Sequence, residues 1–599
     1  MEHLAVALLA WPAQLLTRPG VFTSDTKSYL YIDPGRYLRQ SASMWDPSVG
    51  LGTVTHQQIG YLFPMGPFFW ATHALGVPTW VAQRLWVGAI LFAAGAGVLW
   101  LCRVLGVSGP GRPVAAVAYM LSPYVLQYLG HISVILLAFA ALPWLLALVE
   151  RAMGRGGWRW PALVALVVAA MGSVNASSAV YVAAGPLVWV LYALATRLHS
   201  GRAVAAAVGR IVLLGVLVSS WWVVALAVEG GYGLDVLRYT ETVQAVSTTS
   251  LSSEVVRGLG YWYFYGGDNF GPWISATPQF TEEVWLLGLG YALPLLGVAG
   301  AFLARWRHRA AFVVMAALGM VLAVGAYPYT DPSPVGRLLR TFFTDSTVGM
   351  ALRSTDRATP LVLLSLAVLA GAGVTALWRR APVAGWVLAG AAVAVAAAAN
   401  PALWDGATIP SSFAEAPVAS YQQTAAAALN RGGSSAVLGV PGQPFAATFA
   451  GMSVDPLWPG LLTRPFVTRE QQVMGSLATE DLLYGLDDPI QSGVADPAAI
   501  APLARLMGVG DVLVQNDLAF TRYDQPDPAL LWHGLTAGPV AGLGAPRGFG
   551  PVRPALTRGR VIDPQTYTLP ASTAPMPSVA VVPVAGTRPL VRAETASGA

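Results

Sequence analysis

The first long polar segment of the chain, roughly residues 24–67, concentrates side chains that can do chemistry. It follows a short apolar stretch and holds Asp25, Asp33 and Asp46, the only lysine (Lys27) and His56. A carboxylate can take a proton from an attacking hydroxyl group, which makes an aspartate here a candidate general base. Of the three, Asp25 stands nearest to the apolar stretch, and we take it as the candidate catalytic residue.

Asp25 and Lys27 are two residues apart. If this stretch is extended, both side chains point to the same side, because side chains alternate along a strand. That would place a base beside an ammonium group able to pair with phosphate. The alternative is a helix cap, in which Ser24 or Asp25 begins a helix that continues through Tyr31.

The other polar residues of this segment are weaker candidates. Asp33-Pro34 is typical of a turn or a helix start, since proline favours the first helical position, so capping is favoured over catalysis for Asp33. The same interpretation applies to Asp46, which precedes Pro47, with Trp45 as a candidate sugar contact. The residues of this segment that we propose for substrate binding are Lys27, Arg36, Trp45, Asp46 and His56.

A second polar cluster precedes a later apolar segment. Arg353 and Arg357 are four residues apart and would share one face of a helix. Arginine binds phosphate through paired donors, so the two could clamp a lipid phosphate. The alternative, weighed evenly, is that they hold the end of the following helix through Asp356. Arg337 and Arg340 are weaker versions of the same pattern.

Composition places these residues in a membrane protein. Of the 599 residues, 55% are hydrophobic and only 11% charged, with a mean hydropathy of +0.56, whereas soluble domains carry about 25% charged residues. The net charge of +5 is spread over short arginine-containing loops and does not indicate nucleic-acid binding. The single cysteine, Cys102, excludes a disulfide framework and a thiolate metal site.

Eleven apolar segments are candidate membrane spans. A helix that crosses a bilayer needs roughly 20 apolar residues. The first contains Pro12 and lacks the basic start of a signal peptide, so we interpret it as a helix; the third and fifth are short enough to be tilted, broken or re-entrant. The segments are Leu4–Leu16, Trp80–Leu101, Val114–Tyr128, Ile132–Leu148, Pro161–Ser173, Ala179–Ala195, Ile211–Val228, Val284–Leu303, Ala310–Tyr327, Leu361–Leu377 and Val383–Ala399.

Arginines follow every even-numbered segment in a short loop. Because positive residues mark cytoplasmic loops, the N-terminus is predicted to be cytoplasmic. The loops 18–79, 229–283 and 328–360, and everything after residue 400, are then extracytoplasmic. The arginine-rich inner loops could also bind an acidic cytoplasmic partner. These arginines are Arg103, Arg112, Arg151, Arg155, Arg159, Arg197, Arg202, Arg210, Arg305, Arg307, Arg309, Arg379 and Arg380.

After residue 400 the hydropathy falls. Helices at Tyr421–Asn430 and Ala499–Met507 alternate with strands at Ser435–Val440 and Asp511–Val514, which predicts a small α/β domain over residues 401–540. Residues 541–599 are rich in proline and threonine with weak β patterns, and we assign them to a separate segment that could begin a truncated module.

Known catalytic motifs are missing from the sequence. It contains no glycine fingerprint for nucleotides, no HExxH or paired CxxC for zinc and no GxSxG for hydrolases. No cofactor is required by the sequence, which leaves the use of a divalent metal open. The predicted spans hold almost no ionisable residues, which argues against an ion-coupled transporter.

Several motifs together resemble one family. They are DTK at residues 25–27, DPGR at 33–36, WDP at 45–47, GYLFPMGP at 60–67, ALRSTDR at 351–357 and VLVQND at 512–517. This set, over roughly the first 520 residues, is similar to the actinobacterial α-(1→3)-arabinofuranosyltransferases of the AftD type, within the GT-C glycosyltransferases. The chain is shorter than usual for that family, which suggests a truncated or short member.

The resemblance implies a fold and an activity. The fold would be a GT-C-like multi-span helical domain, in residues 1–400, in the plasma membrane, with an extracytoplasmic α/β domain. The donor would be decaprenylphosphoryl-arabinose and the acceptor an arabinan of arabinogalactan or lipoarabinomannan, with inversion at the sugar carbon. Asp25 would be the general base, and Lys27, Arg353 and Arg357 would stabilise the leaving phosphate. The alternatives are another polyprenyl-phosphate sugar or a non-catalytic scaffold of the same architecture.

Overall fold

The computed structural model describes residues 1–23, 25, 27–55, 58–409, 414–415, 418–469, 475–555, 569–570 and 572–588. The chain forms two compact units. The helical unit comprises residues 1–26, 60–224 and 240–412, and the sheet unit comprises residues 27–59, 225–239 and 413–599.

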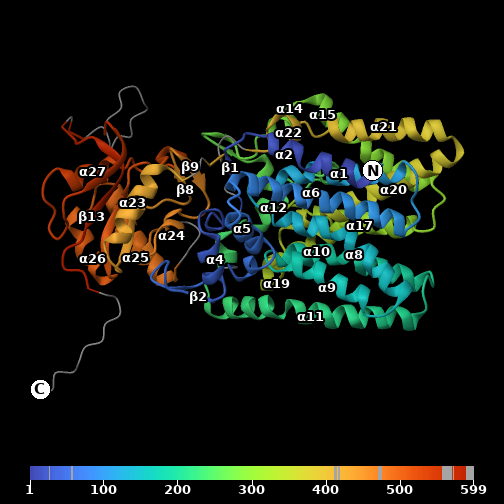
Figure 1. Cartoon of the computed structure of the whole chain (residues 1–599), viewed down its shortest axis with the longest axis horizontal. Helices are drawn as coiled ribbons and strands as arrows, with labels where there is room; N and C mark the ends of the chain where they lie inside the picture. The colour runs from blue at the N-terminus through green and yellow to red at the C-terminus, as the bar shows by residue number, and fades with distance from the viewer. Residues whose placement is uncertain are drawn as a thin grey trace, which may run out of the picture. The chain divides into compact units, whose positions relative to one another are not determined.

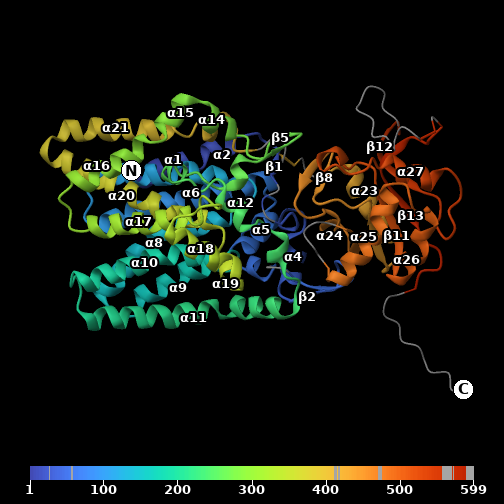
Figure 2. The same ribbon diagram turned by 180° about the vertical axis from the view of Figure 1, so that it is seen from behind.

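Long apolar helices build the helical unit, where they run side by side (Figures 1 and 2). Each of the eleven predicted spans overlaps helical structure. The corresponding helices are α1 (Glu2–Ala10), α2 (Pro12–Leu16), α6 (Thr79–Val104), α7 (Gly111–Met120), α8 (Ile135–Arg155), α9 (Arg159–Gly172), α10 (Ala176–Ala195), α11 (Gly201–Tyr232), α15 (Val284–Leu289), α16 (Ala292–Leu303), α17 (Arg309–Val324), α20 (Thr359–Arg380) and α21 (Pro382–Ala398).

Six stretches in the described part of the chain are helical, long and apolar enough to cross a bilayer, and three shorter apolar helices accompany them. The prediction of a multi-pass membrane protein is therefore confirmed, while the count of eleven spans stays a prediction. The six stretches are Thr79–Val104, Ile135–Arg155, Ala176–Ala195, Gly201–Tyr232, Val284–Leu303 and Thr355–Arg380.

The predicted third span, Val114–Tyr128, is broken in its second half, which is one of the alternatives that its short length left open. Helix α7 ends at Met120, and a 3₁₀ turn, η2 (Pro123–Gln127), takes over. The reason is Pro123, which disfavours helical backbone at the preceding residue. Ser122 accordingly has an extended conformation, with φ −63° and ψ 146°. This break makes room for the turn that carries the candidate site.

Helix α20 lies at the centre of the helical unit, against α7, α16 and α17. The contact with α7 is close because it is made by glycines: a Cβ atom on Gly111 would lie 2.1 Å from the carbonyl oxygen of Gly371. Small residues let membrane helices approach backbone to backbone. This packing holds the middle of α20 against α7.

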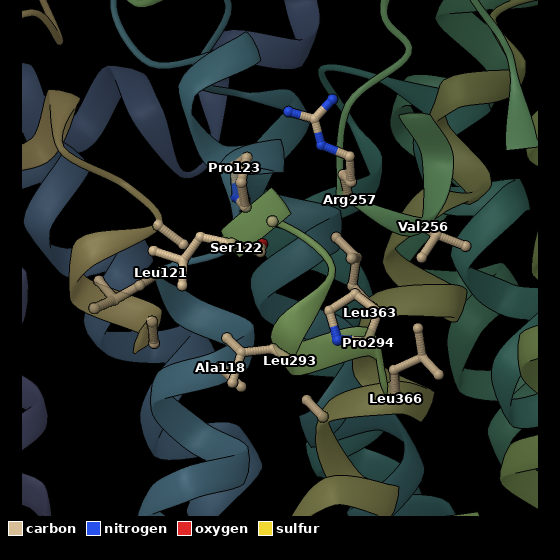
Figure 3. Close-up of a pocket in the computed structure, with 15 residues that line it drawn as sticks. Ala118, Leu121, Ser122, Pro123, Val256, Arg257, Leu293, Pro294, Leu363 and Leu366 are labelled. Atoms are coloured by element: carbon tan, nitrogen blue, oxygen red, sulfur yellow. The ribbon is translucent and has the colours of Figure 1, made fainter. Parts of the chain in front are cut away.

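An apolar cavity of about 40 Å³ lies among α7, α16, α20 and α21. Its lining includes Leu121, Leu293 and Leu363, and Arg257 lies at its edge with the guanidinium turned away from these side chains (Figure 3). Arg257 is paired with Glu254 at 2.8 Å. Sugar-sized ligands need a pocket of roughly 300 Å³ or more with several polar groups. This cavity therefore suits a small piece of hydrocarbon rather than a sugar.

A five-stranded mixed sheet forms the core of the sheet unit, in the order β10-β7-β11-β13-β12. The first three strands are parallel, and β13 pairs antiparallel with both β11 and β12. The strands are β7 (Ala436–Val440), β10 (Phe466–Val467), β11 (Val509–Gln515), β12 (Arg547–Arg553) and β13 (Met576–Pro583).

Helices cover both faces of this sheet. Leu438 and Val512 face α25 (Leu477–Gln491), α26 (Ile500–Leu506) and α27 (Ala529–Thr536). Their neighbours Val437 and Leu513 face α23 (Ser420–Arg431) and α24 (Trp458–Leu461) on the other side. Side chains alternate along a strand, so both alternating sets are apolar when a sheet is covered twice. The predicted α/β character of this region is confirmed.

The predicted boundary at residue 540 does not match the sheet. Strands β12 and β13 both lie beyond it, and β13 pairs with β11 from Asp511↔Pro583 to Gln515↔Val579. Strand β13 is buried, since Val579 and Val582 are at most 1% exposed. The proline-rich composition around it made its β pattern weak in the sequence. The described part of residues 541–599 therefore completes the α/β domain instead of starting a separate module.

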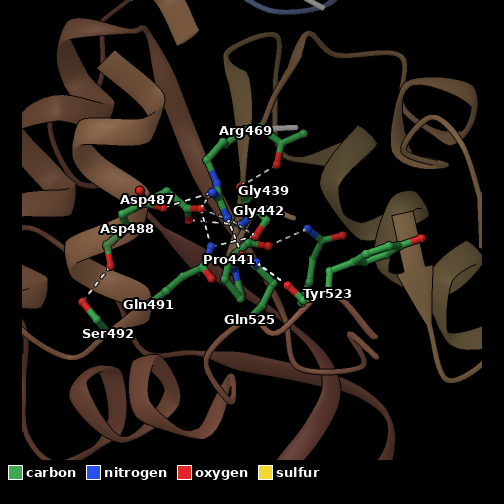
Figure 4. Close-up of polar contacts among 12 residues, drawn as sticks. Gly439, Pro441, Gly442, Arg469, Asp487, Asp488, Gln491, Ser492, Tyr523 and Gln525 are labelled. Carbon is green, nitrogen blue, oxygen red and sulfur yellow. Dashed lines mark hydrogen bonds and ion pairs between the residues drawn. The ribbon is translucent and has the colours of Figure 1, made fainter. Parts of the chain in front are cut away.

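A buried polar cluster fixes the loop after β7 to α25 (Figure 4). Arg469 forms ion pairs with Asp487 at 2.7 Å and with Asp488 at 3.0 Å. Asp487 also accepts the backbone N–H of Gly442 at 3.0 Å, and Arg469 donates to the carbonyl oxygen of Gly442 at 2.8 Å. The Asp487 side chain is 4% exposed, whereas that of Asp488 is 61% exposed.

We expect these two ion pairs to differ in their effect on stability. Asp487→Leu leaves the buried Arg469 guanidinium without its main partner and should lower the free energy of unfolding by about 3 kcal/mol. Asp488→Leu removes an exposed partner of the same arginine and should cost less than about 1 kcal/mol. Thermal unfolding of the detergent-solubilised full chain measures both. Equal losses for the two variants would show that burial does not decide the difference.

Candidate active site

One turn of the helical unit organises the candidate site. It runs from η2 to the start of α8 and is closed by the N–H of Ile132, which donates to the carbonyl oxygen of Tyr128 at 3.1 Å. Gln127 ties it to a second loop: its side chain donates to the carbonyl oxygen of Gly258 at 3.0 Å and accepts the N–H of Tyr261 at 2.8 Å. The turn is thus held from both sides in a fixed conformation.

Asp25 contacts this turn. The backbone N–H of Ser133 donates to its Oδ1 at 2.7 Å, and the carboxyl group is completely buried. Burial raises the pKa of Asp25 to about 6, although the hydrogen bonds from Ser133 work in the opposite direction. A carboxylate with a pKa near the working pH is suited to general-base catalysis, since it is mostly ionised and still basic.

Asp356 contacts the same turn from η5 (Thr355–Ala358), the 3₁₀ turn that leads into α20. The hydroxyl group of Tyr128 donates to its carboxylate, which is 3% exposed. Tyr128 and Ser133 are five residues apart in a closed turn, far nearer than the roughly 17 Å that five extended residues can span. One turn therefore contacts both Asp25 and Asp356.

Arg357 follows Asp356 and points to the start of α10. Its guanidinium donates to the hydroxyl group of Ser177, in the first turn of a helix capped by Asn175, whose side chain accepts the N–H of Ser178 at 3.0 Å. Helix N-termini and arginines both attract phosphate. The positive charge also acts on Tyr261, whose pKa is raised by burial and by Glu241 and lowered by Arg357.

The prediction that Arg353 and Arg357 share a helix face is wrong. Arg353 precedes η5 (Thr355–Ala358) and lies in an irregular stretch. Its buried guanidinium donates to Thr240 and to the carbonyl oxygen of Glu241, and burial lowers its pKa. Arg353 therefore ties two loops together. A role in phosphate binding stays a prediction for both arginines, with Arg357 better placed.

Lys27, Arg36, Trp45 and Asp46 belong to the sheet unit, and their role in substrate binding stays a prediction. Lys27 forms an ion pair with the buried Asp455 at 2.9 Å. Arg36 donates to the carbonyl oxygens of residues 459, 460 and 462. Both cations are thus engaged by the protein itself.

Asp33 and Asp46 act as a helix cap and a turn residue. Asp33 accepts the N–H of Arg36 at 3.0 Å and caps α4 (Pro34–Ser41), as predicted. Asp46 accepts the N–H of Ser48 at 2.8 Å. Arg36 and Asp46 line a cavity of about 10 Å³, room for roughly one water molecule. Trp45 is 55% exposed.

His56 lies outside the described residues, so its predicted role is not addressed by the structure. Among the residues that are described, no group of three or more metal-ligating side chains is placed to hold a metal ion.

Two residues of the site, Tyr128 and His131, were not among the predicted site residues. Neither belongs to a motif: Tyr128 ends the predicted membrane span Val114–Tyr128, and His131 follows it. The one available signal was the aromatic run of residues 261–265, whose Tyr261 stacks on Tyr128 with ring centres 4.9 Å apart.

Comparison with known families identifies the family to which the chain belongs. Residues 9–598 match the family described as alpha-(1->3)-arabinofuranosyltransferase, N-terminal GT-C domain. The chain belongs to this family. The AftD-type resemblance predicted from the opening segment is confirmed.

Two curated relatives of the AftD family carry the name alpha-(1->3)-arabinofuranosyltransferase. The protein from Mycobacterium tuberculosis is 32% identical over 92% of this chain, and that from Mycolicibacterium smegmatis is 31% identical over 91%. The chain spans 40% and 39% of the length of these relatives.

A cryo-EM structure of arabinofuranosyltransferase AftD from mycobacteria has the same fold. It superposes with a TM-score of 0.75 at 24% identity, over 97% of this chain and 40% of that one. The R1389S mutant in its class 1 state gives a TM-score of 0.70 at 26% identity.

Proposed function

We propose that this AftD-type domain transfers arabinofuranose from a polyprenyl-phosphate donor, decaprenylphosphoryl-arabinose, to an arabinan acceptor of arabinogalactan or lipoarabinomannan. One observation carries the proposal. A completely buried carboxylate, Asp25, with a pKa of about 6, is held by the same turn that contacts Asp356, next to Arg357. Family membership supports arabinofuranose as the transferred sugar, and the polyprenyl-phosphate donor is part of the proposal.

The proposed reaction is a single inverting displacement. The oxygen of an acceptor hydroxyl group attacks the anomeric carbon of the donor sugar, and its proton passes to the Asp25 carboxylate. The bond from that carbon to the phosphate oxygen breaks, and its electron pair leaves with the phosphate. Asp25 thus ends the step protonated, and the product carries the opposite anomeric configuration.

The chain offers a place for the negative charge that develops on the phosphate. Arg357 carries a positive charge beside the N-terminus of α10, and the Ser177 hydroxyl adds a polar contact. Donors aimed at a developing charge stabilise a transition state strongly. Asp356 contributes indirectly, because it accepts the Tyr128 hydroxyl and holds the turn that positions Asp25.

The orientation in the membrane follows from the arginines. They cluster after α6, α8, α10, α16 and α20, which by the positive-inside rule supports a cytoplasmic location for those helix ends. The N-terminus is then cytoplasmic, and the candidate site and the sheet unit are extracytoplasmic, where lipid-linked sugars and cell-wall glycans would meet. An acidic cytoplasmic partner for the arginine clusters stays a prediction.

We expect the rate of transfer to depend on the protonation of Asp25. With a pKa of about 6, the carboxylate is about 90% ionised at pH 7 and about 10% ionised at pH 5. The value of kcat/KM should therefore rise with pH, about tenfold per unit below pH 6, and level off above pH 7. A flat profile between pH 5 and pH 7 would contradict Asp25 as the base.

Reconstitution tests the proposed function. The purified full chain in lipid vesicles is given a synthetic prenylphosphoryl-arabinose and an arabinan oligosaccharide, and the product is analysed by mass spectrometry and linkage analysis. The expected result is one added pentose. Transfer only from a different prenyl-phosphate sugar would replace the proposed donor, and a folded protein that transfers no sugar would favour the scaffold alternative.

A further inference from the structure

His131 occupies the middle of the turn that joins Asp25 to Asp356. It is 7% exposed, and neither ring nitrogen makes a hydrogen bond of normal geometry to any residue that the structure describes. Buried polar groups in folded proteins nearly always have a partner, so each exception needs an explanation. An imidazole left this way in a candidate active site points to a ligand.

Aromatic rings hold the imidazole in place. Tyr263 stacks on His131 with ring centres 4.6 Å apart, and Trp273 stacks on Tyr263 at 4.8 Å. Tyr128 and Tyr261 lie near the same imidazole, each at 6.4 Å. The rings fix the orientation of the imidazole through apolar contacts. The Leu129 backbone, which acts to raise its pKa, is the polar group near the ring, and neither nitrogen makes a hydrogen bond of normal geometry within the described residues.

The protonation state of His131 fits a hydroxyl-rich ligand. Burial lowers its pKa to about 3, so the ring is neutral at physiological pH. A neutral imidazole has one N–H donor and one nitrogen acceptor. A sugar hydroxyl group likewise donates and accepts, whereas a phosphate without a proton only accepts. The imidazole therefore suits a sugar better than a phosphate.

The position of His131 favours contact with the transferred sugar over contact with the acceptor. The general base Asp25 contacts Ser133, two residues after His131, and Asp356 contacts Tyr128, three residues before it. In the proposed displacement the acceptor oxygen lies at the base and the leaving phosphate near Arg357. The transferred sugar lies between these two places, which is where the turn places His131.

We infer that His131 is a binding residue for the transferred pentose, with its imidazole hydrogen-bonded to a ring hydroxyl group and the Tyr263–Trp273 stack as the wall behind it. This inference rests on the proposed function for the identity of the sugar. It assigns to the turn a second task besides holding the base, that of recognising the donor.

Binding of the donor tests this inference without requiring turnover. The affinity of the purified full chain for a short-chain prenylphosphoryl-arabinose is measured by calorimetry for wild type and for His131→Phe. Phenylalanine keeps the aromatic stack and removes both nitrogens, and the loss of one or two hydrogen bonds should weaken binding about tenfold. His131→Asn retains a donor and an acceptor and should bind with intermediate affinity.

His308→Phe is the matched control. His308 is also buried, at 6% exposed, and also packs on an aromatic ring, Trp189 at 5.2 Å. It lies at the N-terminal end of α17. The residues that contact Thr355 lie at the other end of this helix, roughly 24 Å away. The His308→Phe variant should bind the donor with the same affinity as wild type.

Deoxy donors identify the contact. For wild type, removal of the hydroxyl group bound by His131 should weaken binding about tenfold, whereas His131→Phe should lose less than about twofold with the same analogue. The inference is overturned if each deoxy donor binds more weakly by the same factor to wild type and to His131→Phe. That result is expected if a water molecule is the only partner of the imidazole. It is also overturned if only acceptor binding changes. Donor binding that depends on His131 without any transfer would instead count against the proposed function alone.

Discussion

Replacement of Asp25 by asparagine is expected to reduce sugar transfer by about 10³-fold while the protein stays folded. The amide cannot accept the proton of the acceptor hydroxyl group at neutral pH, although its oxygen can still accept the N–H of Ser133. The side chains are nearly equal in volume, so the packing of the buried site is retained. Single-turnover transfer from prenylphosphoryl-arabinose in vesicles measures the effect on the chemical step.

Stability should move in the opposite direction to activity. The pKa of Asp25 is raised from 3.8 to about 6 in the folded protein, so ionisation of the buried group costs ~3 kcal/mol of stability at pH 7. This cost is small at pH 4 and absent below about pH 3, where the carboxyl group is neutral in both states, and it grows as the pH rises to 6. Asp25→Asn should therefore melt at an equal or higher temperature than wild type at pH 7.5, with most of the gain lost at pH 4.

Asp33→Asn is the control for this experiment. It makes the same chemical change in the same polar segment, and asparagine caps a helix as well as aspartate does. Transfer by this variant should stay within about twofold of wild type, since the cap on α4 is preserved. Unchanged transfer by Asp25→Asn would falsify the assignment of the base, and equal losses in both variants would show that the segment is sensitive to charge rather than to a base.

Apolar patterns allowed the helices to be predicted, because a membrane span must satisfy its backbone internally and so depends mainly on length and hydropathy. The exception is the break in the third predicted span at Pro123. It results from a local backbone effect, although the hydropathy of the segment is sufficient for a span. In the sheet unit the pattern of β11 was recognisable, whereas β13 was assigned to another segment because prolines surround it. Its place beside β11 depends on pairing across more than 60 residues, which no local pattern encodes.

The candidate site was predictable only in part for a related reason. Asp25 stands out because a carboxylate beside an apolar segment is rare, and Arg357 because arginines before a span are conspicuous. His131 has no such signal: it is one of seven scattered histidines, and its importance comes from contacts with residues more than 100 positions away. The sequence likewise could not separate Arg353 from Arg357, since their difference depends on where the helix begins.

Arg357→Gln is expected to lower kcat for sugar transfer by about 10²-fold, with little change in stability. The guanidinium is only partly buried and donates to the Ser177 hydroxyl group, a contact that the amide of glutamine can also make. What is lost is the positive charge near the N-terminus of α10 that would stabilise the leaving phosphate. Arg357→Lys keeps this charge but not the paired donors, and should recover part of the rate.

Arg353→Gln should give the reverse result. Arg353 is 4% exposed, and its guanidinium holds Thr240 and Glu241, which also accepts the Ser354 hydroxyl at 2.6 Å. The loss of these charged hydrogen bonds should reduce the free energy of unfolding by about 2 kcal/mol. The fraction that remains folded should transfer sugar within a fewfold of the wild-type rate, because the guanidinium is already committed to the two loops.

Arg340→Gln separates charge in general from charge at the site. Arg340 lies on α18 (Pro334–Asp345), donates to the carbonyl oxygen of Tyr329 at 2.7 Å and stacks over its ring. The variant removes one positive charge from the same region of the chain without touching the residues around Ser177. If kcat falls equally in Arg357→Gln and Arg340→Gln, the rate depends on the overall field that attracts the anionic donor. If only Arg357→Gln loses rate, and lysine restores part of it, the charge acts at the phosphate itself.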